Sequence, residues 1–109
     1  MAVSKMRHFE VVFDVRTLDH IAAIDRKYHS LIRREIEDRL VFEPDAPTRN
    51  RKPLTRGTVM GDTWEVRCGP SNSFRIFYDV HRDQRQVVII AIARKVGNAL
   101  FVGKERFEP

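Results

Sequence analysis

The chain lacks the features that mark secreted, membrane-spanning or metal-dependent proteins. Its single cysteine, Cys68, excludes an internal disulfide, and no cluster of metal-ligand residues accompanies it. No apolar run approaches the roughly 20 residues that a membrane-spanning helix needs, and the segment Met1–Glu10 contains no signal-peptide core. These absences favour a cytoplasmic protein in a reducing compartment, with no membrane partner, no metal and no cofactor.

The sequence also lacks the motifs of common enzyme families. It has no Ser-His-Asp arrangement, no HExxH zinc motif, no P-loop and no dinucleotide-binding fingerprint. Neither an internal repeat nor a low-complexity segment interrupts it. With 109 residues, 42% of them hydrophobic, the chain is long enough for one domain, residues 1–109, with its own core. The side chains that remain as candidates for chemistry are the lysines and arginines.

Positive charge is concentrated in the second half of the chain. The formal net charge is +5. Residues 1–48 contain 8 Lys/Arg and 9 Asp/Glu, a net charge of −1, whereas residues 49–109 contain 12 and 6, a net charge of +6. A basic surface indicates a polyanionic partner, either a nucleic acid or an acidic protein. The alternative is that the charge serves only solubility.

Two alternating runs predict a β-hairpin between residues 63 and 80. Apolar residues recur at every second position from Trp64 in the first run and from Phe74 in the second, which is typical of strands. The segment Gly-Pro-Ser-Asn at 69–72 is typical of a turn. If Trp64 and Phe74 both face the core, Arg67 and Arg75 share the opposite face. Two guanidiniums on a rigid sheet suit a phosphate or a carboxylate.

The rest of the pattern predicts an α+β fold. Helical spacing of apolar residues predicts two helices, 18–28 and 30–42, or one bent helix. Residues 9–15 predict a strand, and residues 86–93, which are apolar in both phases, predict a strand covered on both faces. We therefore expect a mostly antiparallel four-stranded sheet with two N-terminal helices, or one bent helix, packed on one face. We expect the charged end, 104–109, to fray.

The segment 48–57, TRNRKPLTRG, predicts a basic loop that leads into the hairpin. A run of charges on a loop is often only solvated, but this one would extend the surface that carries the two hairpin arginines. A further basic pair follows the central strand. The candidates to bind RNA phosphates are Arg49, Arg51, Lys52, Arg56 and Arg94.

The order of these segments resembles the RelE/ParE superfamily of bacterial toxins. The resemblance lies in WEVR, a short turn, FRIFYDV and the strand VVIIAIARK, with TRNRKPL before them and AIARKVGNALFVGKE at the end, and it covers about residues 9 to 105. It implies a RelE-like fold and the toxin of a type II toxin-antitoxin system. RelE-like toxins cut messenger RNA at the ribosome without a metal, by attack of the 2′-hydroxyl on the adjacent phosphate. The implied partners are messenger RNA, the ribosome and a cognate acidic antitoxin.

The resemblance also implies roles for three basic residues. Arg75, in the FRIFY motif, matches the arginine that stabilises the phosphate. Lys95 matches the basic residue after the central strand, which clamps the phosphate or assists the leaving group. Arg67 matches an arginine at the end of the preceding strand. These three residues form the catalytic set that the family pattern suggests.

Two departures from the family pattern leave other functions open. Lysines that serve as base and charge in the family correspond here to Thr63 and Glu65, so Glu65 is the candidate base. The family's C-terminal tyrosine corresponds to Phe101, which has no exchangeable proton. ParE-like toxins share the fold but bind DNA gyrase without cutting RNA, and an inactive basic binding domain is a third possibility. Retention of Arg75 and Lys95 favours the ribonuclease.

Overall fold

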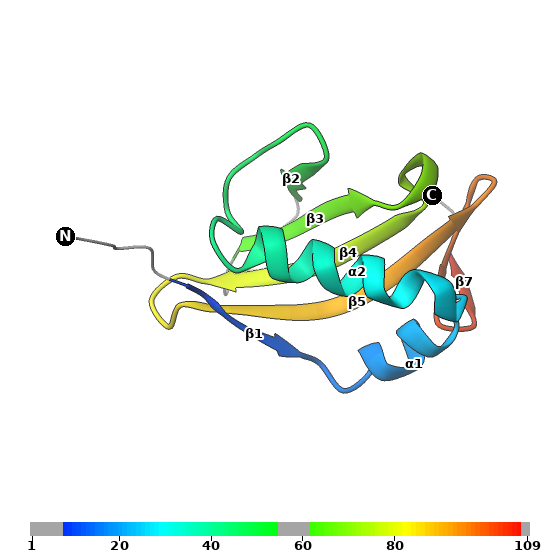
Figure 1. Ribbon diagram of the computed structural model, residues 1–109, viewed down its shortest axis with the longest axis horizontal. Coiled ribbons are helices and arrows are strands. Elements are labelled where there is room, and N and C mark those ends of the chain that lie inside the picture. The colour runs from blue at the N-terminus through cyan, green and yellow to red at the C-terminus, as the bar shows by residue number, and fades with distance from the viewer. Residues whose placement is uncertain (1–7, 55–61, 108–109) are drawn as a thin grey trace.

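The computed structural model describes residues 8–54 and 62–107 and shows helices lying across one side of a twisted sheet (Figure 1). Strand β1 (Glu10–Phe13) leads to helix α1 (Thr17–Ala22), and helix α2 (His29–Glu35) follows. A 3-10 turn, η1 (Arg26–Tyr28), precedes α2, and a π-helical turn, η2 (Ile36–Leu40), extends it. The later strands are β2 (Arg51–Pro53), β3 (Asp62–Cys68), β4 (Phe74–His81), β5 (Gln86–Val96), β6 (Ala99–Val102) and β7 (Glu105–Phe107), with a 3-10 turn, η3 (Pro70–Asn72), between β3 and β4.

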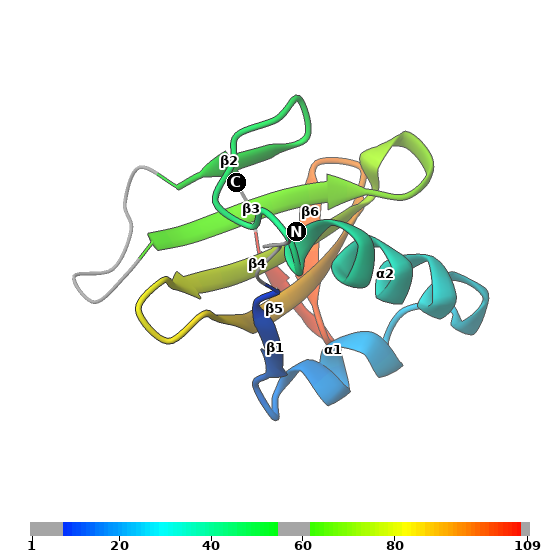
Figure 2. The same cartoon turned by 60° about the vertical axis from the view of Figure 1, so that its left-hand side comes forward.

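The sheet has seven strands, so the predicted number of four is wrong. Six of them run antiparallel in the order β2-β3-β4-β5-β6-β7, and β1 pairs in parallel with the first half of β5. The predicted α+β class, the mostly antiparallel sheet and the helices on one face are confirmed (Figures 1 and 2). The three additional strands are β6, which is apolar, and β2 and β7, which are three residues long and mostly charged. The strands β2 and β7 have the less expected positions. They form in the segments that we expected to be a loop and a frayed end, because each pairs with a longer neighbour.

Two helices form, as the pattern predicts, but α1 is only six residues long. The chain leaves the helix at Ala23 and starts again at η1, where Asp25 Oδ1 accepts a hydrogen bond from the Lys27 backbone N–H at 3.1 Å. Such a cap stabilises the new start and explains why one long helix does not form. Within the described residues, no helix combines the length and the apolar character needed to cross a membrane.

The core lies between the helices and one face of the sheet. Ile32, Ile36 and Leu40 of the helical segment pack with Ile76 and Tyr78 of β4, and all five are at most 2% exposed. The remaining strand residues of this cluster come from positions with the same phase, which include Trp64, Val66, Phe74, Val80, Val87, Ile89 and Ile92. The alternation along β3 and β4 therefore separates a core face from an opposite face.

A β-bulge interrupts the pairing of β5 with β4. Phe77 lies opposite Ala91, but the next residue, Tyr78, lies opposite Ile89, so Ile90 has no opposite residue. The extra residue shifts the phase of β5 by one position. Val87 and Ile89 before the bulge, and Ile92 after it, consequently all face the core. This shift explains why the strand is apolar in both phases.

Gly69 begins the turn between β3 and β4 and lies against the core residue Phe74. Its φ is +83°, and a Cβ at this position would lie 2.4 Å from Phe74 Cδ2. Gly97 also has a positive φ, +63°, but its Cβ would meet open space. We expect Gly69→Ala to lower the free energy of unfolding by about 3 kcal/mol, and Gly97→Ala by only about 1 kcal/mol, the cost of backbone strain. Urea denaturation of both variants measures the difference, and equal losses would contradict the packing of Phe74 against Gly69.

Candidate functional site

Arg67 and Arg75 lie directly opposite each other on β3 and β4. Trp64 and Phe74 are each 4% exposed and belong to the core cluster, so alternation sends the two arginines to the face opposite the helices. The structure thus confirms that they share one face. Like charges in directly opposed positions repel each other, and the pair therefore needs a counter-charge.

Glu65 supplies this counter-charge. Its Oε2 accepts a hydrogen bond from Arg67 Nε at 3.1 Å and lies 3.5 Å from Arg75 Nη1. Glu65 is only 5% exposed, so its carboxylate has lost most of its contact with water and depends on the two guanidiniums. Within the described part of the chain, its second oxygen, Oε1, has no hydrogen-bond partner. Two positive charges and one negative charge leave the network with a net charge of +1.

Two lysines border this network. Arg75 pairs with Ala93, and Lys95 lies two residues further along β5, so its side chain projects from the same face. Lys52 pairs with Glu65 in the register of β2 and β3. Both lysines are exposed. We call the surface formed by Lys52, Glu65, Arg67, Arg75 and Lys95 the cationic face.

Arg51 does not extend the cationic face, contrary to the expected basic loop. It begins β2 and pairs with Val66, a core residue, and it is 7% exposed. Its Nη1 donates a hydrogen bond to the Arg39 carbonyl oxygen at 3.3 Å, within η2. A cation at this end of the helical segment satisfies a carbonyl that the helix leaves open. Arg51 therefore connects β2 to the helices inside the protein.

Arg94 also lies on the side of the helices, and this position corrects its grouping with the cationic face. It pairs with Phe74 on one side and Phe101 on the other, and its guanidinium lies 4.7 Å from the centre of the Phe101 ring. Phe101, which corresponds to the family's tyrosine, thus shares the phase of Arg94 and not that of Arg75. A hydroxyl at that position would point away from the cationic face.

The other two predicted basic residues have different outcomes. Arg49 is exposed in the turn before β2. The next residue, Asn50, accepts a hydrogen bond from the Arg67 backbone N–H at 2.8 Å, which places this turn beside the cationic face. Arg56 lies outside the described residues.

Tyr78 and Cys68 are packing residues. The Tyr78 hydroxyl donates a hydrogen bond to the Pro44 carbonyl oxygen at 2.7 Å, and burial raises the pKa of Tyr78 well above its ordinary value. Burial also raises the pKa of the Cys68 thiol to about 12, which keeps it protonated and unreactive at neutral pH.

Two histidines, His20 and His29, serve structural roles. His20 Nδ1 accepts a hydrogen bond from the Ile92 backbone N–H at 3.3 Å, and His29 Nε2 donates one to the Ile24 carbonyl oxygen at 2.8 Å. Within residues 8–54 and 62–107, no group of three His, Cys, Asp or Glu side chains is arranged to hold a metal ion.

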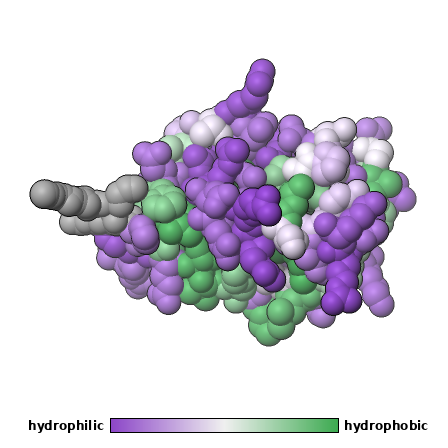
Figure 3. Space-filling model, in the orientation of Figure 1, coloured by the Kyte–Doolittle hydropathy of each residue, from purple (hydrophilic) through white to green (hydrophobic). Residues whose placement is uncertain are grey.

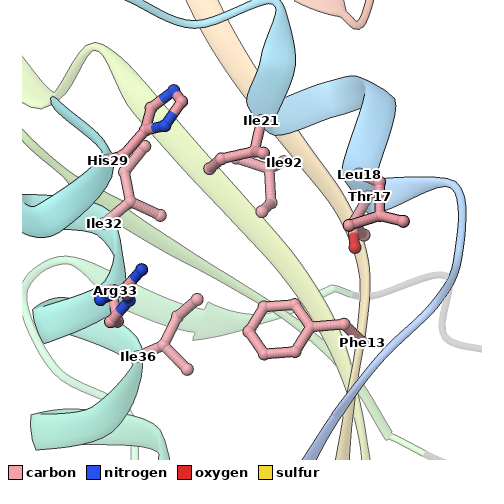
Figure 4. A pocket seen from close by; sticks show the side chains of 9 residues that line it. All are labelled: Phe13, Thr17, Leu18, Ile21, His29, Ile32, Arg33, Ile36 and Ile92. Carbon is pink, nitrogen blue, oxygen red and sulfur yellow. The ribbon is translucent and has the colours of Figure 1, made fainter. Parts of the chain in front are cut away.

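A second surface, an apolar groove, lies on the side of the helices. It is a cavity of about 330 Å³ between β1, α1 and α2, in which Ile32 and Ile36 face Phe13 and Ile21 (Figure 4). Phe13 is 50% exposed and Leu18, on its rim, is 65% exposed. Figure 3 shows hydrophobic side chains gathered over β1 and the start of α1. An exposed apolar surface of this kind is typical of a protein-binding site.

Comparison with solved structures places this arrangement among known folds. The chain resembles the toxin-antitoxin complex RelBE2 from Mycobacterium tuberculosis, with a TM-score of 0.66 and 20% identity over 81% of this chain and 99% of that one. It also resembles the archaeal RelE–RelB complex from Pyrococcus horikoshii OT3, with a TM-score of 0.65 and 20% identity over 84% and 98%. The chain has the RelE fold. No protein-family model and no curated protein matches the sequence, so the RelE fold rests on structure.

Removal of the Glu65 charge tests the network. We expect Glu65→Gln to lower the free energy of unfolding by about 1–2 kcal/mol, because Arg67 and Arg75 then face each other without a counter-charge. The loss should shrink in high salt, which screens the repulsion. Glu37→Gln, on an exposed residue of η2, is the control and should have little effect. Equal stability of the two variants at low salt would show that Glu65 does not hold the arginines.

Proposed function

We propose that this protein is the toxin of a type II toxin-antitoxin system and that it acts in the cytoplasm as a metal-independent endoribonuclease on ribosome-bound messenger RNA. The observation that carries the proposal is the cationic face, where Arg75 and Arg67 share the carboxylate of Glu65 and Lys95 lies on the neighbouring strand. The RelE fold and the toxin-antitoxin complexes among its structural neighbours support it.

Each group on this face has a suitable task in phosphodiester cleavage. Arg75 and Arg67 donate hydrogen bonds to the phosphoryl oxygens as negative charge increases in the transition state. Glu65, which both arginines contact, partly neutralises their charge in the free protein. The Arg75 side chain is 15% exposed. An incoming phosphate replaces part of this interaction, so the arginines exchange one oxyanion for another and remain in place.

Proton transfer uses the two remaining groups. Glu65 Oε1, which has no partner among the described residues, accepts the proton of the 2′-hydroxyl. The 2′-oxygen then forms a bond to phosphorus, and the bond from phosphorus to the 5′-oxygen breaks. The Lys95 ammonium gives a proton to that leaving oxygen. The products are a 2′,3′-cyclic phosphate and a 5′-hydroxyl end, and water returns the proton from Glu65 to Lys95.

Induced expression in bacteria, followed by primer extension on a translated message, tests this function. We expect wild-type protein to create new 5′ ends inside the coding region, and Arg75→Ala to reduce them by about a hundredfold or more, in line with the loss of one oxyanion donor. Arg34→Ala removes an exposed arginine of α2 and should leave cleavage unchanged. Growth arrest without new 5′ ends would reject the ribonuclease and favour binding to DNA gyrase, and absence of arrest would favour an inactive binding domain.

The cognate antitoxin would use both surfaces. An acidic segment fits the cationic face, and apolar side chains fit the groove between β1 and α2. Both structural neighbours are complexes with an antitoxin, which supports this occupant for the exposed Phe13 and Leu18.

A growth-rescue screen tests the antitoxin proposal. Fragments of the source genome are co-expressed with the toxin, and the fragment that restores growth encodes the partner. We expect Leu18→Glu to stay toxic and to weaken binding of the rescuing protein by about tenfold, because a charge enters an apolar contact. Asp38→Asn, at an exposed residue of η2 that does not line the groove, is the control. Unchanged affinity of the Leu18 variant would exclude the groove.

A further inference from the structure

A second pocket lies at the end of the β4–β5 pair, on the side of the helices. It is a cavity of about 410 Å³ between η1 and the ends of the two strands, and its polar lining consists of Asp25, Tyr28, Ser73, Arg94 and Lys95. Apolar parts of its wall come from Phe74 and Val96. The pocket therefore combines an aromatic ring, a hydroxyl group, two cations and one carboxylate within one small volume.

The two cations of this pocket outnumber its one acid, Asp25, and are not paired with it in the described structure. Within the described residues, neither Arg94 nor Lys95 forms a salt bridge. The Arg94 guanidinium lies over the Phe101 ring, and its Nε, like that of Arg75, is buried without a hydrogen-bond partner in the described part of the chain. A guanidinium that is partly desolvated and uncompensated has a strong demand for an anion. By contrast, Arg67 and Arg75 on the cationic face already share Glu65.

Tyr28 presents a further feature of nucleotide sites. Its ring packs on Phe74 with 5.1 Å between centroids, and Lys27 Nζ lies 5.1 Å from the centre of the Tyr28 ring. The phenol is therefore held in place by packing, while it still borders the pocket. Aromatic side chains next to a basic groove are the usual platform for the bases of single-stranded nucleic acids.

Lys95 connects this pocket to the cationic face. By its phase on β5 it shares the face of Arg75, and it also lines the pocket beside Arg94. Its backbone N–H donates a hydrogen bond to the Ser73 carbonyl oxygen at 2.7 Å, which holds the end of β5 against the start of β4. An extended ligand that leaves the cationic face at Lys95 thus meets Arg94 next.

We propose that this pocket binds a nucleotide of single-stranded RNA next to the phosphate that Arg75 holds. Arg94 and Lys95 take its phosphate, and Tyr28 stacks on its base. The proposal rests on the proposed ribonuclease function and extends it: the RNA passes around the end of β4 and β5, from one face of the sheet to the other. The ligand class is single-stranded RNA, because a stacking ring and unpaired cations occur together.

Binding of a 2′-O-methyl RNA oligonucleotide, which lacks the attacking hydroxyl, tests the pocket. Fluorescence anisotropy over a range of salt concentrations gives the affinity and its salt slope. We expect Arg94→Gln to weaken binding by about tenfold and to reduce the slope by about 0.7, the value for one phosphate contact on a single strand. Tyr28→Leu should weaken binding by about fivefold and leave the slope unchanged, because it removes stacking and no charge. Arg94→Lys keeps the charge and should keep the slope.

Arg34→Gln is the matched control, since it removes one exposed positive charge from α2. Equal affinity and slope for Arg94→Gln and Arg34→Gln would overturn the pocket while leaving the cationic face intact, provided that Arg75→Ala still weakens binding. If Arg94→Gln and Arg75→Ala both bind RNA as tightly as the wild type, RNA is rejected as the ligand, and the proposed function is rejected with it. If Arg94→Gln binds RNA normally but loses the rescuing antitoxin, the pocket belongs to the protein partner and the RNA proposal is wrong. If Arg94→Gln melts below the assay temperature, Tyr28→Leu carries the test, and RNA affinity of Tyr28→Leu equal to that of the wild type would contradict the assignment.

Discussion

A single carboxylate holds two arginines at adjacent positions of two strands, and the chemistry of this surface depends on it. The register of β3 with β4 forces Arg67 and Arg75 into direct opposition, where their charges repel. Glu65, two residues before Arg67 on the same face, accepts a hydrogen bond from Arg67 and forms an ion pair with Arg75. The same arrangement that stabilises the sheet therefore keeps two guanidiniums oriented and only partly neutralised, ready for a second oxyanion.

The two faces of the sheet meet different demands. One face carries the large side chains that pack under α2, and this packing holds β3 and β4 in place. The opposite face carries the charged network and is positioned by that packing. Arg51 and Arg94 belong to the core side by their phase and not to the cationic face. Arg51 connects β2 to the helices, and Arg94 lines the pocket beside η1. Basic residues that are close in sequence, such as Arg94 and Lys95, are thus divided between two surfaces that meet at the end of β5.

The hairpin and its faces were predictable because period two encodes which side each residue takes. Trp64 and Phe74 begin clear alternations, so the positions of Arg67 and Arg75 followed from them. Arg94 could not be placed in this way, since β5 is apolar in both phases and a bulge at Ile90 shifts its phase. The short polar strands β2 and β7 carry no hydrophobic signal, and they form only through pairing with β3 and β6. Likewise, the exposed groove residues Phe13 and Leu18 have the pattern of core residues and were separated from the core only by the fold.

The proposed function requires that the network of Glu65, Arg67 and Arg75 binds a phosphate of RNA. The most direct measurement follows the NMR signals of the arginine Nε–H groups during titration with a 2′-O-methyl RNA oligonucleotide. We expect the signals of Arg67 and Arg75 to shift together as the phosphate takes the place of part of the Glu65 contact, whereas the signal of Arg34 on α2 stays unchanged. Shifts confined to arginines on the side of the helices, with Arg67 and Arg75 unaffected, would contradict it.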